Sequence, residues 1–186
     1  MKVLLTGSSK GIGYKIANDL LAEGHELALH YNKNESPLSA LLKKDKTGSF
    51  SIQADLSQQE EIKKMVENTI GKLSFPDCII NNAGIAESAD ISLDINDWSK
   101  MFDKTIDVNL KAPSLIFKEF LRYKREKKIN SRLRIINIAS RAAFRGEQQD
   151  YISYACSKGG IISLKKTIFS FFLLIFFLIW TFGPKI

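Results

Sequence analysis

The chain has 186 residues, of which 45% are hydrophobic, and a formal net charge of +7. A chain of this length can bury one sizeable core, so one domain is expected rather than two. The two cysteines, Cys78 and Cys156, lie far apart and outside any metal-ligand spacing. No metal site is therefore expected, and a reduced, cytoplasmic chain is the simplest inference. The N-terminal residues lead directly into an apolar strand, which leaves no room for a secretory signal.

The densest positive charge lies between Leu121 and Arg134, where seven residues are basic and one is acidic. Such a run could suit a polyanionic partner, but it lacks the regular interleaving of aromatic residues and glycines that accompanies nucleic-acid patches. We therefore interpret it as the solvated end of a helix and the loop that follows, and we expect no nucleic-acid partner.

Short apolar runs alternate with longer stretches of helical period along the chain. This alternation is typical of βαβ units, in which helices cover both faces of a parallel sheet. The fold class expected is therefore α/β. The predicted strands, in chain order, are Lys2–Leu5, Glu26–Tyr31, Ser49–Gln53, Cys78–Asn81 and Leu133–Ile138.

The helices between the first four strands carry local start and stop signals. The first is predicted over Ile12–Glu23 and ends at Gly24, a residue suited to a left-handed C-terminal turn. Residues 32–48 indicate a loop and a short helix. The third helix, residues 57–73, is expected to begin with a capping box formed by Ser57 and Glu60. One face of it is apolar and predicted to be buried: Ile62, Met65, Val66, Thr69 and Ile70.

A glycine-rich turn joins the first strand to the first helix, where residues 6–13 read Thr-Gly-Ser-Ser-Lys-Gly-Ile-Gly. Glycines at such a turn let backbone N–H groups and the helix N-terminus approach a pyrophosphate, which any Cβ would hinder. The turn lacks the Gly-Lys-Ser/Thr ending of the NTPase loop and departs from the usual G-x-G-x-x-G pattern. It predicts a site for a nucleotide phosphate, although a tight structural turn alone would also need glycines.

The pattern T-G-x-x-x-G-x-G resembles that of the short-chain dehydrogenase/reductase family, and the resemblance extends over about residues 2–167. The family's further motifs follow in its order and at its spacings. They are Ala-Asp-Leu at Ala54–Leu56, Asn-Asn-Ala-Gly at Asn81–Gly84, Asn109, Ser140, and Tyr-Ala-Cys-Ser-Lys at Tyr154–Lys158.

The resemblance implies a Rossmann-type, doubly wound parallel sheet with strand order 3-2-1-4-5. It also implies that Asp55 and Leu56 lie near the adenine ring of a dinucleotide and that residues 82–84 lie beside its adenosine half. The residues expected to bind the cofactor are Thr6, Gly7, Ser8, Ser9, Lys10, Gly11, Ile12, Gly13, Tyr31, Asn32, Asp55, Leu56, Asn82, Ala83, Gly84, Tyr154 and Lys158.

The end of the second strand indicates which nicotinamide cofactor is preferred. Enzymes that use NAD place a carboxylate there to hold the ribose 2′-hydroxyl, and it repels a 2′-phosphate. Here the strand ends in His-Tyr-Asn-Lys, without an acid, while Lys10 and Lys33 could supply positive charge. We expect NADP(H) rather than NAD(H); the alternative is that both lysines are simply exposed.

Tyr154 and Lys158 are four residues apart, so on a helix both side chains emerge on one face. A free tyrosine has a pKa near 10, and a nearby ammonium group stabilises its phenolate. Tyr154 could then donate a proton to a carbonyl oxygen. By resemblance, Ser140 orients that carbonyl and Asn109 supports a proton-relay water. Tyr151 is a rival tyrosine, but its partner position is an alanine.

The pattern is most similar to that of the 3-oxoacyl-acyl-carrier-protein reductases. This resemblance implies an NADP(H)-dependent oxidoreductase of fatty acid biosynthesis that reduces a carbonyl to an alcohol by hydride transfer. The carbonyl would belong to a small molecule or to a carrier-bound acyl group. Two alternatives stay open: a truncated product that binds nucleotide without catalysis, and a membrane-tethered variant.

The composition changes abruptly after Thr167, since residues 168–182 contain no charge and six of the twelve phenylalanines. A transmembrane helix needs about 20 apolar residues, so this segment is marginal for one. A helix buried in this domain would need cover on every side. We prefer a third interpretation, a frame change or interrupted gene. Residues 1–167 would then form the catalytic domain and 168–186 an atypical hydrophobic tail. The family's last two strands would be missing, and no family-type homo-oligomer is expected.

Overall fold

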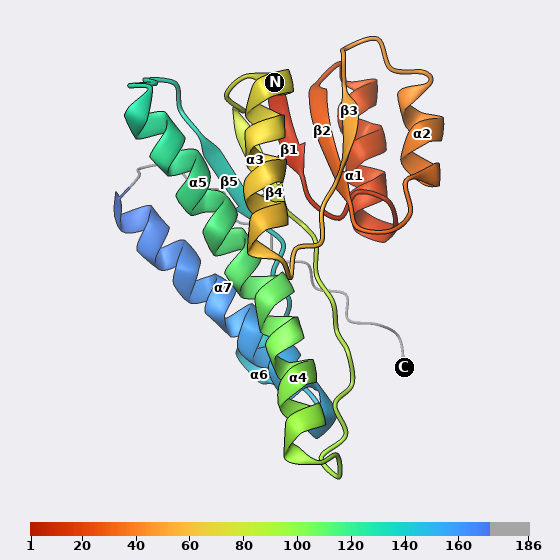
Figure 1. Cartoon of the computed structure of the whole chain (residues 1–186), viewed down its shortest axis with the longest axis vertical. Coiled ribbons are helices and arrows are strands. Elements are labelled where there is room, and N and C mark those ends of the chain that lie inside the picture. The colour runs from red at the N-terminus through yellow and green to blue at the C-terminus, as the bar shows by residue number, and fades with distance from the viewer. Residues whose placement is uncertain (172–186) are drawn as a thin grey trace.

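The computed structural model describes residues 1–171 of the chain. Within them, five parallel strands form one sheet of order β3-β2-β1-β4-β5 (Figure 1). The strands are β1 (Lys2–Leu5), β2 (Glu26–Tyr31), β3 (Phe50–Gln53), β4 (Cys78–Asn81) and β5 (Arg134–Asn137). The predicted α/β class and strand order are confirmed. β3 begins one residue later than predicted, because Ser49 bonds the Leu27 N–H through its hydroxyl (2.9 Å).

Helices cover both faces of the sheet, as expected of a doubly wound fold. They are α1 (Gly11–Ala22), α2 (Ser36–Leu42), α3 (Gln59–Leu73), α4 (Ile95–Ile106), α5 (Ala112–Glu126), α6 (Ala142–Arg145) and α7 (Ile152–Phe171). A π-helical turn, η1 (Asp107–Lys111), joins α4 to α5, and a 3₁₀ turn, η2 (Gln149–Tyr151), precedes α7.

Alternate residues of β1 point to the two faces of the sheet and so divide the core into two layers. Leu4 packs in a cluster with α3 and α5, which includes Ile62 and Phe120. Val3 and Leu5 pack in the other cluster, with α1 and α2. This period of two is the geometry of a strand buried on both faces.

The end of α1 confirms the stop signal predicted at Gly24. Gly24 has φ +77°, and its N–H bonds the Leu21 carbonyl (3.0 Å) while the His25 N–H bonds that of Leu20 (3.0 Å). Positive φ is a conformation that glycine adopts without steric cost.

The predicted capping box at the start of α3 is wrong. Ser57 instead donates its hydroxyl to Asp55 Oδ1 (2.8 Å), and Glu61, not Glu60, accepts the Asp55 N–H (2.6 Å). The Asp55 carboxylate therefore closes a turn with Ser57, and the helix begins only at Gln59. The buried face is largely as predicted: Ile62, Met65, Val66 and Thr69 are buried, with Leu73 beside them, and Ile70 is partly buried.

The basic run lies on the last turns of α5 and the loop that follows, as the sequence indicated. Arg122 pairs with Glu119 (2.9 Å) and Glu126 (2.8 Å) on the surface of this helix.

α7 runs through Thr167, the predicted domain boundary, and Ile168 is buried. The predictions about the hydrophobic tail concern residues that lie mostly outside the described part of the chain, so they stay predictions. Over residues 1–171, no helix combines the length and apolar character needed to cross a membrane.

Candidate functional site

The predicted site residues gather at one edge of the sheet, where the carboxyl ends of all five parallel strands meet. Thr6 follows β1, Tyr31 ends β2, Asp55 follows β3, Asn82 follows β4 and Ser140 lies just past β5. The chain reverses its direction of winding between β1 and β4, which are neighbours in the sheet. Open α/β sheets bind ligands at this switch point.

The glycine turn has the backbone shape that its sequence indicated. Gly7 and Gly11 have φ of +66° and +54°, which only glycine adopts readily. Gly13 is needed for a different reason, because a Cβ there would lie 2.2 Å from the Gly7 carbonyl oxygen. A Cβ at Gly11 would meet no atom within 4 Å, so this part of the turn faces open space.

The start of α1 fits a bound phosphate. Within residues 1–171, no side chain caps its first turn, and this turn contains no acid. Its N–H groups therefore retain their capacity to bind an anion, which the helix dipole also favours. Lys10, Gly11 and Ile12 are exposed at this end, and Ser9 is half-buried. These features fit the pyrophosphate of a dinucleotide.

Ser8 and Thr6 hold the glycine turn in place through hydrogen bonds. The Ser8 hydroxyl and N–H both donate to the His30 carbonyl (2.8 and 2.9 Å), so neither is free to donate to a ligand. Thr6 Oγ1 accepts the N–H groups of Asn82 (3.0 Å) and Ala83 (3.1 Å). Asn82 in turn donates its side-chain amide to the carbonyl oxygens of Thr6 (2.9 Å) and Gly7 (3.0 Å). These hydrogen bonds connect the segment that follows β1 to the segment that follows β4.

His30 lies on β2 and supports the glycine turn, a contact that the sequence reasoning missed. Its Nδ1 accepts the Gly7 N–H (3.0 Å), and its Nε2 donates to the Ala54 carbonyl (2.9 Å), which assigns the neutral Nε2–H tautomer. Burial lowers the pKa of His30. The available signal was a histidine directly after the apolar run Leu27–Leu29.

The end of β2 holds a carboxylate that the strand sequence did not reveal. Glu35, at the start of α2, accepts the hydroxyl of Ser51 on β3. Burial raises the pKa of Tyr31, and the Glu35 carboxylate raises it further. Asn32 and Lys33 are exposed nearby. The expectation of no acid at this strand end was therefore incomplete, because the chain folds back after the strand.

Asp55 and Leu56 follow β3 and have different surroundings. Asp55 is half-buried and holds the N–H and hydroxyl of Ser57 with Oδ1 (2.9 and 2.8 Å). Leu56 is buried and belongs to the core cluster beneath α3.

Tyr154 and Lys158 lie on one face of α7, as their spacing predicted. Lys158 Nζ lies 5.7 Å from the centroid of the Tyr154 ring and donates to the Ile138 carbonyl (3.0 Å). Only 5% of Lys158 is exposed, and this burial lowers its pKa to about 8. The Lys158 ammonium group therefore lies beside the Tyr154 ring.

Asn109 lies in the π-helical turn η1 and is buried. Its Oδ1 accepts the Ile85 N–H (2.8 Å), and its Nδ2 donates to the Ile85 carbonyl (2.8 Å). A Cβ added to Gly84 would lie 3.3 Å from Asn109 Oδ1 and 3.4 Å from Lys158 Nζ. The Asn-Asn-Ala-Gly motif therefore meets the Asn109 and Lys158 side chains at one point.

Ser140 lies half-buried before α6, where its Oγ accepts the Ala142 N–H (3.2 Å). This bond is an ordinary helix-start contact. In the described part of the chain no acceptor takes the hydroxyl hydrogen of Ser140, which leaves it able to donate to a ligand.

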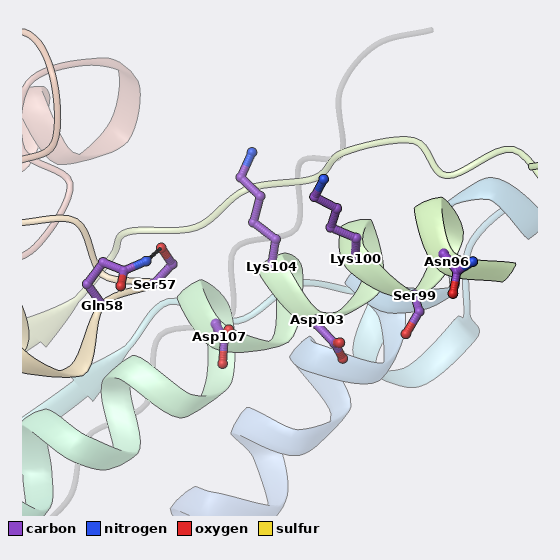
Figure 2. Close-up of a pocket in the computed structure, with 8 residues that line it drawn as sticks. All are labelled: Ser57, Gln58, Asn96, Ser99, Lys100, Asp103, Lys104 and Asp107. Atoms are coloured by element: carbon purple, nitrogen blue, oxygen red, sulfur yellow. Dashed lines mark hydrogen bonds between the residues drawn. The ribbon is translucent and has the colours of Figure 1, made fainter. Parts of the chain in front are cut away.

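A pocket of about 450 Å³ lies between α4 and the residues that precede α3. Figure 2 labels the side chains that line it. None of its lining residues is a predicted site residue, so it is separate from the Tyr154 and Lys158 pair. It is lined by Ser57, Gln58, Asn96, Ser99, Lys100, Asp103, Lys104 and Asp107. Residues 1–171 contain no cluster of side chains that could hold a metal ion.

Comparison with known proteins decides the family. The family model described as short chain dehydrogenase matches residues 1–170. The chain belongs to the short-chain dehydrogenase family. The 3-oxoacyl-[acyl-carrier-protein] reductase FabG of Staphylococcus epidermidis is 30% identical over 167 residues, which are 88% of this chain. The match spans 66% of the length of that reductase.

Two solved structures show the same family fold with different nicotinamides bound. The blue fluorescent protein from a metagenomic library, in complex with NADPH, has a TM-score of 0.77 and 26% identity, covering 91% of this chain and 67% of its own. A 4-hydroxyisoleucine dehydrogenase complexed with NADH and succinate has a TM-score of 0.78 and 30% identity, covering 90% of this chain and 69% of its own.

Proposed function

We propose that this short-chain dehydrogenase reduces a carbonyl to an alcohol with NADPH, through Asn109, Ser140, Tyr154 and Lys158. The observation that carries the proposal is the buried Lys158, whose Nζ lies 5.7 Å from the centre of the Tyr154 ring and also reaches Gly84 of the Asn-Asn-Ala-Gly motif. A buried cation beside a tyrosine is a costly arrangement, and such perturbed groups concentrate at functional sites.

Tyr154, Lys158 and Ser140 have direct parts in the proposed reaction. The predicted residues at the ends of β1 to β4 would hold a reduced nicotinamide cofactor, which would provide the hydride for the carbonyl carbon. Tyr154 donates its phenolic proton to the carbonyl oxygen, and the Lys158 ammonium stabilises the phenolate that remains. The Ser140 hydroxyl donates a hydrogen bond to the same oxygen and so orients the carbonyl. Because the pKa of Lys158 is about 8, the charged form predominates at neutral pH.

The proposed cofactor site consists of the predicted residues at the ends of β1 to β4, with the pyrophosphate at the start of α1. We propose NADP(H) rather than NAD(H), because Lys10 at the start of α1 and Lys33 just past the end of β2 supply positive charge on the side where the ribose is expected. The Glu35 carboxylate is engaged by the Ser51 hydroxyl. The bound NADPH of one similar structure supports this choice, while the NADH of the other makes it a point to measure.

The proposed substrate is a 3-oxoacyl group or a related ketone, free or attached to a carrier protein. The support for it is the similarity to the Staphylococcus epidermidis reductase. A role in fatty acid biosynthesis and a cytoplasmic location rest on the same similarity and are proposed with it.

The experiment compares Tyr154→Phe with Tyr151→Phe in the full chain. Reduced cofactor is mixed with an acetoacetyl thioester, and its oxidation is followed by absorbance with NADPH and NADH in parallel. Wild type and Tyr151→Phe should oxidise NADPH faster than NADH. Tyr154→Phe should lose about 10²- to 10⁴-fold in kcat, the contribution of a general acid, and still bind NADPH.

Tyr151 is the matched control because it is a half-buried tyrosine just before α7 without a lysine four positions on. A wild-type chain that binds NADPH but never oxidises it would contradict the proposed reduction. That result would instead support the alternative of a non-catalytic nucleotide-binding protein.

A further inference from the structure

The hydroxyl of Ser157 joins parts of the site that are far apart in the sequence. Ser157 lies on α7 directly before Lys158 and is fully buried. Its Oγ donates to the Tyr154 carbonyl (2.7 Å) and accepts a hydrogen from Asn109 Nδ2 (3.0 Å). A hydroxyl has one hydrogen to donate, so its donor capacity is used completely.

The bond to Tyr154 alone would be unremarkable, because helical Ser and Thr often bond a carbonyl one turn back. Thr69, Thr105 and Ser114 do so in this protein. Ser157 differs because it also receives a hydrogen from a side chain 48 positions earlier in the chain. Its hydroxyl therefore connects two elements and not only two turns of one helix.

Asn109 extends this connection to a third segment. One Nδ2 hydrogen goes to Ser157, the other goes to the Ile85 carbonyl, and Oδ1 accepts the Ile85 N–H. Ile85 directly follows the Asn-Asn-Ala-Gly motif. The hydrogen-bonded series thus runs from α7 through the π-helical turn to the loop after β4. π-helical turns are rare in proteins, and those that occur are frequently found at functional sites.

The orientation of the Asn109 amide bears on the reacting groups. Its Oδ1 and Lys158 Nζ both approach the position where a Cβ of Gly84 would be, at 3.3 and 3.4 Å. A rotation or shift of this amide would therefore change the surroundings of Lys158 Nζ beside Gly84 of the Asn-Asn-Ala-Gly motif. Ser157 is the side chain that fixes the amide from the α7 side.

We propose that Ser157 is a positioning residue, which holds the Tyr154–Lys158 turn of α7 in register with Asn109 and the loop after β4. This inference rests on the proposed function, in which Tyr154 and Lys158 act on the carbonyl. Ser157 acts through its neighbours, because both of its hydrogen bonds are made within the protein.

The first test compares Ser157→Ala with Ser153→Ala. Ser153 is a matched control: it is buried on the same helix one turn earlier, and its Oγ has no partner among the described residues. Ser157→Ala should lower kcat by about 10- to 100-fold with little change in the KM for NADPH, since it misplaces groups without removing them. Ser153→Ala should retain the wild-type kcat.

A double-mutant cycle tests whether Ser157 acts through Asn109. If it does, Ser157→Ala should add little to the effect of Asn109→Ala, so the double variant should be about as slow as Asn109→Ala alone. Fully additive effects on kcat would overturn the proposal. Ser157→Thr keeps the hydroxyl and should lie closer to wild type than Ser157→Ala.

A readout without turnover separates this proposal from the proposed function. In the cofactor-free chain, hydrogen exchange of the Ile85 amide, measured by NMR, should be faster in Ser157→Ala and unchanged in Ser153→Ala. Unchanged exchange in Ser157→Ala, or an equal increase in both variants, overturns the positioning role. If the wild type never turns over substrate, the proposed function fails while the exchange result still decides the role of Ser157. If Ser157→Ala does not fold, Ser157→Cys replaces the hydroxyl by a thiol, a weak donor and acceptor, and should also speed Ile85 exchange.

Discussion

Lys158 keeps a titratable ammonium group where only 5% of the residue reaches solvent. Its pKa falls from 10.5 to about 8 because burial disfavours the charged form. This shift corresponds to about 3 kcal/mol of destabilisation below pH 8, where both the folded and unfolded chains carry the charge. Between pH 8 and 10.5 the unfolded chain holds more protons, so the contribution of Lys158 to stability rises with pH. The residue therefore opposes folding at the pH where its charge serves the proposed chemistry.

Replacing Lys158 should separate stability from activity. Lys158→Met should raise the free energy of unfolding at pH 7 by about 1–3 kcal/mol, because the relief of desolvation exceeds the loss of the hydrogen bond to Ile138. The gain should shrink as the pH approaches 10.5, and turnover should be lost. Urea denaturation at several pH values measures the free energy of unfolding of wild type and Lys158→Met. Lys166→Met, at an exposed position of the same helix, should change stability by less than about 0.5 kcal/mol. A Lys158→Met variant less stable than wild type at pH 7 would count against a desolvated lysine.

At the scale of elements, α7 approaches the π-helical turn closely only because Gly160 has no side chain. A Cβ on Gly160 would lie 2.5 Å from Leu110 Cδ2 and 3.0 Å from Leu110 Cδ1. The preceding residue, Gly159, has nothing within 4 Å of the corresponding position. Two adjacent glycines of one helix thus differ in whether a methyl group can be accommodated.

This difference predicts opposite effects of one substitution. Gly159→Ala should raise the free energy of unfolding by up to about 1 kcal/mol, because alanine favours the helix. Gly160→Ala should lower it by about 1–3 kcal/mol, because Leu110 must move and α7 is pushed from η1. Thermal unfolding of both variants measures the contrast. Equal stabilisation by both alanines would show that the Leu110 side chain moves aside without lowering the free energy of unfolding.

At the scale of the whole molecule, His30 joins the turn after β1 to the residue after β3. Its buried Nδ1 must stay unprotonated to accept the Gly7 N–H. Burial is the largest influence on its pKa and lowers it, against the opposing effects of the hydrogen bond to Ala54 and the Asp55 charge. The unfolded chain therefore takes up a proton near pH 6.5, while the folded chain does not. Stability due to this group is complete above pH 6.5 and is lost as the pH falls below it.

The wild type should therefore lose up to about 1.4 kcal/mol of unfolding free energy per pH unit through this histidine below pH 6.5. His30→Gln should be less stable at pH 7 but should show a shallower decline toward pH 5, as measured by urea denaturation. His25→Gln, at the opposite end of β2, should keep most of the wild-type slope. Parallel declines in wild type and His30→Gln would exclude His30 as the source.

The sequence by itself determined the sheet, the glycine turn and the pairing of Tyr154 with Lys158. These features depend on neighbouring residues: alternation along a strand, the φ values open only to glycine, and the four-residue spacing of a helix face. The strand order came from the family resemblance, and the sheet confirmed it. The boundary at Thr167 and the nature of the tail stay predictions.

The tertiary structure alone decided which polar groups meet. The Ser157–Asn109 bond spans 48 positions, the Gly7–His30 bond 23, and the Glu35–Ser51 bond 16. Such partners are set by how helices and strands pack, so no local pattern encodes them. The failed capping box has a local cause instead, because the carboxylate of Asp55, two positions earlier, accepts the Ser57 hydroxyl. Local chemistry fixed what each segment becomes, and packing fixed which side chains act together.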